Sequence, residues 1–111
     1  MADRAKELMR VVVDESTAAT HDLVAGEAGY DIVVAAAALS AANDVKITLK
    51  DETGDLLPAQ LREDGGPLVL PDSHGGWARC TAGEKLRLTL SAGVAVSGVV
   101  VYRLVPSGME F

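Results

Sequence analysis

Residue types that often build functional sites are scarce in this chain of 111 residues. It has one cysteine, Cys80, and two histidines, and aromatic side chains make up only 4% of the sequence. A single thiol excludes an internal disulfide and a cysteine pair that binds a metal ion. We therefore expect Cys80 to be a buried, inert thiol. The shortage of aromatics also leaves few large side chains to line a ligand pocket.

Basic residues and long apolar runs are scarce as well. Ten Lys and Arg side chains stand against sixteen Asp and Glu, which gives a net charge of −6. Nucleic-acid binding relies on a cluster of basic side chains, and because no such cluster is present we expect no direct contact with nucleic acid. The longest apolar run, residues 32–39, is too short for a membrane span. The first residues lack the apolar stretch of a signal peptide, so we expect the chain to fold in a cytoplasm without a membrane partner.

Patterns typical of catalytic or metal sites are also missing. Asp72, Ser73 and His74 are the residue types of a hydrolase triad, but consecutive residues cannot converge on one substrate atom. Neither His21 nor His74 has the spacing of a zinc site. Residues 51–55 lack the ligand spacing of a calcium loop, so we expect a hairpin turn with solvated charges. The sequence predicts no enzyme activity, no cofactor and no metal.

What the chain does have is a β-rich pattern. Hydrophobic residues make up 49% of the sequence, and most are Val, Ala and Leu. Turn-forming clusters recur about every ten residues, as in a β-sandwich or barrel. Residues 45–50 and 86–90 alternate between apolar and polar side chains, which predicts strands with one buried face. The length fits one domain, for which we predict an all-β sandwich of about eight short antiparallel strands.

Two further segments, residues 32–39 and 94–105, are apolar on both faces. Such a strand lies between two layers or is covered by a partner, and a chain this short has little material for a third layer. The alanine run at 35–38 also permits a helix, but we favour a strand that forms a hairpin with residues 45–50 through Asn43 and Asp44. The candidate partner interface comprises Val11, Val13, Val33, Ala35, Ala37, Val99 and Val101.

The first ten residues differ in composition from the remainder. They are polar and contain three basic side chains, Arg4, Lys6 and Arg10. We interpret residues 1–10 as an N-terminal arm that contacts a partner, and residues 11–111 as the sandwich domain. Trp77 allows two interpretations, a large filler of the aliphatic core or an exposed ring that stacks on a sugar or a partner, and we favour the core.

The order of the turns and strands in the C-terminal half resembles that of a group of small virion proteins of tailed bacteriophages. The resemblance extends over residues 20–105. It is carried by residues 68–71, by Gly75-Gly76-Trp77, by residues 82–92 and 96–102, and upstream by residues 23–25, 32–34 and 39–42.

The proteins that this chain resembles are head decoration, or cement, proteins, which form jelly-roll-like sandwiches on the capsid exterior. The resemblance implies a structural protein of the virion that binds the major capsid protein and itself, as a dimer or trimer, and stabilises the shell. It implies no catalytic residue. The alternative is another virion module, from a tail, neck or fibre, that binds a host surface glycan through Trp77.

Overall fold

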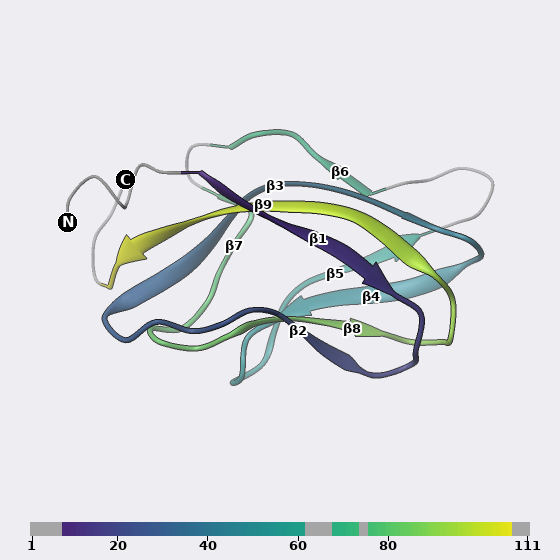
Figure 1. Cartoon of the computed structure of the whole chain (residues 1–111), viewed down its shortest axis with the longest axis horizontal. Helices are drawn as coiled ribbons and strands as arrows, with labels where there is room; N and C mark the ends of the chain where they lie inside the picture. Colours follow the sequence, from purple (N-terminus) through teal and green to yellow (C-terminus); the bar gives the residue numbers. More distant parts are fainter. Residues whose placement is uncertain (1–7, 62–67, 74–75, 108–111) are drawn as a thin grey trace.

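The computed structural model describes residues 8–61, 68–73 and 76–107, and each regular element within them is a β-strand (Figure 1). Nine strands are present in the described ranges, one of them only two residues long. They are β1 (Met9–Glu15), β2 (Thr20–Val24), β3 (Tyr30–Ala41), β4 (Val45–Lys50), β5 (Asp55–Leu61), β6 (Leu68–Leu70), β7 (Ala78–Arg79), β8 (Leu86–Leu90) and β9 (Val96–Pro106). The all-β prediction is confirmed.

The strands form two stacked antiparallel sheets. Sheet A has the order β1-β9-β3-β6, with β7 also paired to β3, and sheet B has the order β2-β8-β4-β5. The pairs β1·β9, β2·β8, β3·β6 and β4·β5 are those of one long hairpin whose successive pairs alternate between the sheets. Rolling up such a hairpin produces a jelly roll. The fold is therefore a jelly-roll sandwich, elongated to 42 × 24 × 18 Å.

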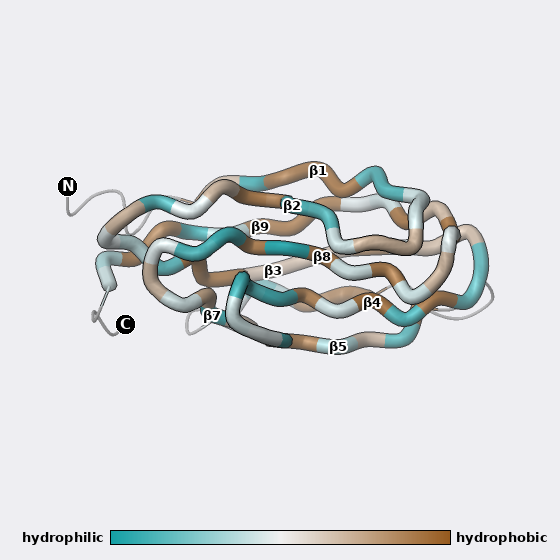
Figure 2. Tube along the Cα trace, turned by 90° about the horizontal axis from the view of Figure 1, so that it is seen from below, coloured by the Kyte–Doolittle hydropathy of each residue, from teal (hydrophilic) through white to brown (hydrophobic). Residues whose placement is uncertain are grey.

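The core lies between the two sheets and is aliphatic. In β4 the side chains of Val45, Ile47 and Leu49 are buried, while the alternate residues face outward. In β8 the buried residues are likewise every second one, from Leu86 to Leu90. Both strands match the alternation expected from the sequence, and Figure 2 shows how this alternation recurs along the strands of sheet B.

β3 is a strand throughout, including its alanine run, so the helical alternative is wrong. Its pairing with β9 shifts between Val34 and Ala36, which leaves Ala35 as the extra residue of a β-bulge. The predicted hairpin between this segment and residues 45–50 is also wrong. β3 belongs to sheet A and β4 to sheet B, so the turn at Asn43 and Asp44 carries the chain from one sheet to the other.

The proposed arm overlaps the first strand. β1 begins at Met9, and Arg10 is paired with Val101 of β9, so Arg10 is part of sheet A and does not belong to an arm. Arg4 and Lys6 lie outside the described residues. In the described ranges, no helix has the length and apolar character that a membrane crossing requires.

Candidate interaction surface

The outer face of sheet B is polar, and its side chains pair with one another. One row across the sheet joins three threonines and a proline, and the next row joins two basic residues flanked on each side by an acidic one. The first row is Thr20, Thr89, Thr48 and Pro58, and the second is Asp22, Arg87, Lys50 and Asp55. The two outer pairs, Asp22 with Arg87 and Lys50 with Asp55, place opposite charges on neighbouring strands, which stabilises the sheet.

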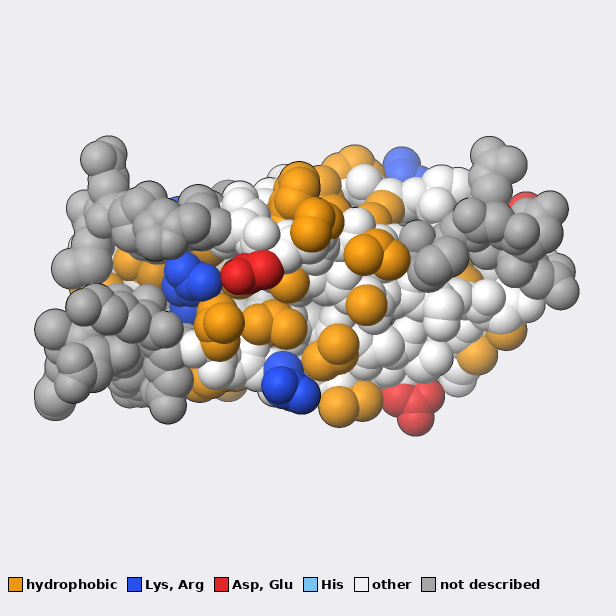
Figure 3. Space-filling view, turned by 90° about the horizontal axis from the view of Figure 1, so that it is seen from above, with side chains coloured by type: hydrophobic (Ala, Val, Ile, Leu, Met, Phe, Trp, Pro, Cys, Tyr) orange, Lys and Arg blue, Asp and Glu red, His pale blue; other side chains and the backbone are white. Residues whose placement is uncertain are grey.

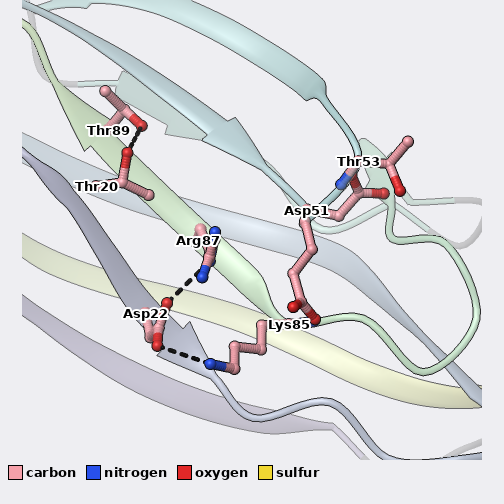
Figure 4. A network of polar contacts seen from close by, with 8 residues as sticks. Thr20, Asp22, Asp51, Thr53, Lys85, Arg87 and Thr89 are labelled. Atoms are coloured by element: carbon pink, nitrogen blue, oxygen red, sulfur yellow. Dashed lines mark hydrogen bonds and ion pairs between the residues drawn. The ribbon is translucent and has the colours of Figure 1, made fainter.

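Contacts on this face pair several of its charged side chains (Figure 4). Asp22 accepts hydrogen bonds from Lys85 Nζ at 3.2 Å and from Arg87 Nε at 2.9 Å. The hydrogen bond from Lys85 is the main reason that the pKa of Asp22 lies below its ordinary value. The hydroxyls of Thr20 and Thr89 lie 2.8 Å apart. Because its groups already satisfy one another, this face is suited to contact with water.

The outer face of sheet A has the opposite character. Pairing places Val12 of β1 beside Val99 of β9, Val99 beside Ala38 of β3, and Ala38 beside Val69 of β6. The row crosses four of the five strands of sheet A, all except the short β7. Val12 is 74% exposed and Val69 63% exposed. We call these four residues the valine row. Figure 3, which views the molecule from this side, shows hydrophobic side chains gathered across the middle of the face with few charges among them.

Neighbouring rows set the limits of this apolar strip. On one side lie Asp14, Ser97 and Ser40, a polar row of exposed side chains. On the other side, Val101 is paired with both Arg10 and Ala36. The first of these rows is polar, and the second is apolar except for Arg10. Exposed apolar side chains are normal when scattered, but a contiguous exposed apolar strip is typical of an interaction site. The valine row is therefore the candidate interaction surface.

The structure corrects most of the predicted partner interface. Val99 and Val101 do lie on the outer face of sheet A and are partly exposed. Val13 and Ala37 instead belong to the core between the sheets, and Val11 packs against that core. Val33 and Ala35 are buried as well. These five residues were wrongly assigned to a partner interface, since four of them are buried within the chain and Val11 packs against the core.

The error concerns parity, that is, which alternate residues of a strand face the core. A shift of one residue moves every side chain of a strand to the other face. In β1 the outward valine is Val12, which the predicted interface does not include. A signal was available: Arg10 and Asp14 are polar and lie two residues on either side of Val12, so all three share a face. In β3 the bulge at Ala35 changes the parity, and no feature of the alanine run indicates its position.

Trp77 is not the predicted core filler. Its side chain is 42% exposed, and it is absent from the hydrophobic core. The indole Nε1–H donates a hydrogen bond of 2.8 Å to the carbonyl oxygen of Pro71, the residue after β6. This bond holds the ring beside the loop that follows β6, where it is partly open to solvent.

A second polar cluster joins two loops at one end of the sandwich. Asp51, at the start of the β4–β5 turn, is only 2% exposed, so the prediction of solvated charges is wrong for this residue. Its Oδ1 accepts N–H bonds from Thr53 and Gly54, and its Oδ2 accepts bonds from the N–H and hydroxyl of Thr81, all at 2.8–2.9 Å. Burial would raise the pKa of Asp51, but these bonds, led by that of the Thr81 N–H, lower it to about 2. The role of Asp51 is to bind two loops together.

Replacing Asp51 by asparagine is expected to lower the free energy of unfolding at neutral pH by about 2 kcal/mol. Because the pKa of Asp51 is lower in the folded chain, its stabilisation is present above pH 3.8 and is lost as the pH falls toward 2. Denaturant unfolding at pH 7 and pH 2 measures both values. Asp55→Asn, an exposed residue of the same hairpin, is the control and should change little. Equal stability of the two variants at pH 7 would contradict the assignment.

The described residues offer little else for chemistry. They contain no group of three or more His, Cys, Asp and Glu side chains that could hold a metal ion. Cys80 is buried, as expected from the sequence. Burial, and then the negative charges of Asp51, Glu84 and Asp31, raises the pKa of its thiol to about 12. The thiolate is the reactive form of cysteine, so Cys80 is inert in the folded protein.

Comparison with models of known protein families gives no match, and neither do comparisons with curated proteins or with solved structures. The fold and the contrast between its two outer faces therefore carry the functional argument.

Proposed function

We propose that this chain is a structural virion protein, a decoration protein that binds the outer surface of a phage capsid through the outer face of sheet A. The observation that carries the proposal is the valine row, an exposed apolar strip that crosses four strands of sheet A beside a polar row. Burying such a row against the major capsid protein removes apolar surface from water, which is the main favourable term in protein association.

The polar face supports this orientation. With sheet A on the capsid, sheet B faces solvent, where Asp22 is paired with Lys85 and Arg87, and Lys50 with Asp55, within the chain. The net charge of −6 suits a layer on the outside of the shell, away from packaged DNA. The jelly-roll fold agrees with the cement proteins that the sequence resembles, although many unrelated functions share that fold.

The proposed mechanism is stabilisation by binding. A protein that binds the assembled shell and not its free subunits shifts the equilibrium toward the shell by mass action. Repeated copies on a symmetric lattice add avidity to a modest single contact. No catalytic step is needed, and the major capsid protein is the partner.

The proposal can be tested with heads of the source phage from which this chain has been removed (stripped heads). Adding the purified chain is expected to decorate the expanded heads and to raise the temperature at which they release DNA by several degrees, because bound copies stabilise only the intact shell. Light scattering or calorimetry with and without the chain measures the shift. The role as a cement protein fails if the chain binds no heads, or if it binds without changing their heat resistance.

Partial exposure of Trp77 favours a second function, in which another virion module binds a host glycan. Aromatic faces stack on sugar rings, and the bond to Pro71 fixes the indole while leaving part of the ring accessible. Binding to host surface polysaccharide that is lost in Trp77→Ala, together with no binding to heads, would favour this function over capsid decoration.

A further inference from the structure

β1 is the least protected of the edge strands in the two sheets. Exposed edges invite pairing with another chain, and proteins block them with proline, bulges or short strands. β5 contains Pro58, β2 has a register shift after Asp22, and β6 is only three residues long. β1 has seven residues, no proline and an unbroken register with β9 from Met9 to Glu15. Within the described residues, β1 ends the order of sheet A and no strand pairs with its other edge.

The sequence of β1 is complementary to itself. In an antiparallel pair of two β1 strands centred on Val12, Arg10 of each copy lies opposite Asp14 of the other. Residues opposite one another in a ladder face the same side, so both pairs of opposite charges form on the outer face. Arg10 and Asp14 are both exposed. From this complementarity we infer that the chain forms a two-fold dimer in which β1 pairs with β1 of a second copy.

The same axis makes the valine row continuous. The row ends at Val12 on the edge of sheet A, and two-fold pairing about Val12 places the same residue of the second copy next to it. Sheets A of the two copies then form one continuous sheet, and one apolar strip runs from Val69 of one copy to Val69 of the other. An isologous contact of this kind closes on itself, as in most symmetric dimers.

The dimer does not depend on capsid binding, since β1 pairs through its edge and the capsid is proposed to contact the outer face. Its test needs only the purified chain, so its failure and that of the proposed function can be distinguished. If both hold, each dimer presents two valine rows to the shell, which increases avidity.

Charge reversal tests the register. Arg10→Asp alone or Asp14→Arg alone places like charges opposite each other twice in the dimer and is expected to raise the dimer dissociation constant by about tenfold or more. The double variant with both substitutions restores opposite pairs and should return the constant to within about threefold of the wild-type value. Lys46→Asp, an exposed residue on the outer face of sheet B, is the control and should leave the dimer unchanged. Sedimentation equilibrium measures each constant, and thermal unfolding checks that each variant is folded.

Cross-linking tests the position of the axis independently. Since Cys80 is buried and inert, a cysteine introduced on the surface is the reactive thiol. Mild oxidation of Val12→Cys should yield a covalent dimer, because directly opposite Cβ atoms in a ladder lie about 5 Å apart. Val69→Cys, at the far end of the same row, should stay monomeric on a denaturing gel.

Three results would each overturn the inference. They are a wild-type chain that is monomeric at millimolar concentration, a double variant that does not recover dimerisation, and cross-linking at position 69 and not at position 12.

Discussion

Gly98→Ala is expected to lower the free energy of unfolding by more than about 3 kcal/mol, a large fraction of the stability of a domain this size. Gly98 lies in β9, paired with Val13 of β1 on one side and Leu39 of β3 on the other. An added Cβ would overlap the carbonyl oxygen of Ala38 and would lie 2.9 Å from the carbonyl carbon of Ala38 and from the Cα of Leu39.

All three of these neighbours are backbone atoms of β3, so no side-chain rotation relieves the overlap. The backbone of Gly98 also has φ of +149°, a conformation that residues with a Cβ rarely adopt. Alanine therefore forces β9 away from β3 in the centre of sheet A. The ladder between these two strands is the longest in the sheet. The sheet that carries the valine row would be lost with it.

Denaturant unfolding followed by circular dichroism measures the effect. The matched control is Gly54→Ala, in the β4–β5 turn, where an added Cβ meets nothing within 4 Å. Its free energy of unfolding should change by less than about 1 kcal/mol. If the two variants are equally stable, the close approach of β9 to β3 is not a feature of the folded protein.

The sequence predicted strands and their buried side best where one face of the strand is exposed to solvent. Val45, Ile47 and Leu49 alternate with polar residues, and the alternation identified both the strand and its buried side. In β3 and β9 both faces are apolar, so the pattern identified strands but not the direction of their side chains. The bulge at Ala35, which reverses the parity of β3, depends on its pairing with β9, which is not a local property of the sequence.

Long-range contacts account for the other differences. Asp51 is followed by Thr53 and Gly54, a local signal for a turn in which an aspartate accepts backbone N–H bonds. Its burial, however, depends on Thr81, thirty residues away.

The turn at Asn43 and Asp44 has the composition of a hairpin loop, but the jelly-roll order sends the strands on either side of it to different sheets. Trp77 was assigned to the core by size alone, and its exposure follows from its position beside Pro71.

Val99→Lys is expected to weaken binding to phage heads by about 100-fold or more. Val99 lies in the middle of the valine row, paired with Val12 and Ala38. A charge buried there without a partner in a dry interface costs several kcal/mol, and each 1.4 kcal/mol is a factor of ten in affinity. The folded chain should tolerate the change, because Val99 is only partly buried and its side chain points away from the core.

The comparison of Val99→Lys with Thr48→Lys tests most directly whether the outer face of sheet A is the binding surface. Thr48 is a β-branched, partly buried residue at the centre of the outer face of sheet B, paired with Thr89 and Pro58, so both variants add one lysine to the middle of a sheet. Co-sedimentation of each folded variant with stripped heads measures its affinity. The account predicts that Val99→Lys stays in the supernatant while Thr48→Lys binds as the wild-type chain does. Binding by Val99→Lys that equals the wild type, with loss of binding in Thr48→Lys, would contradict it.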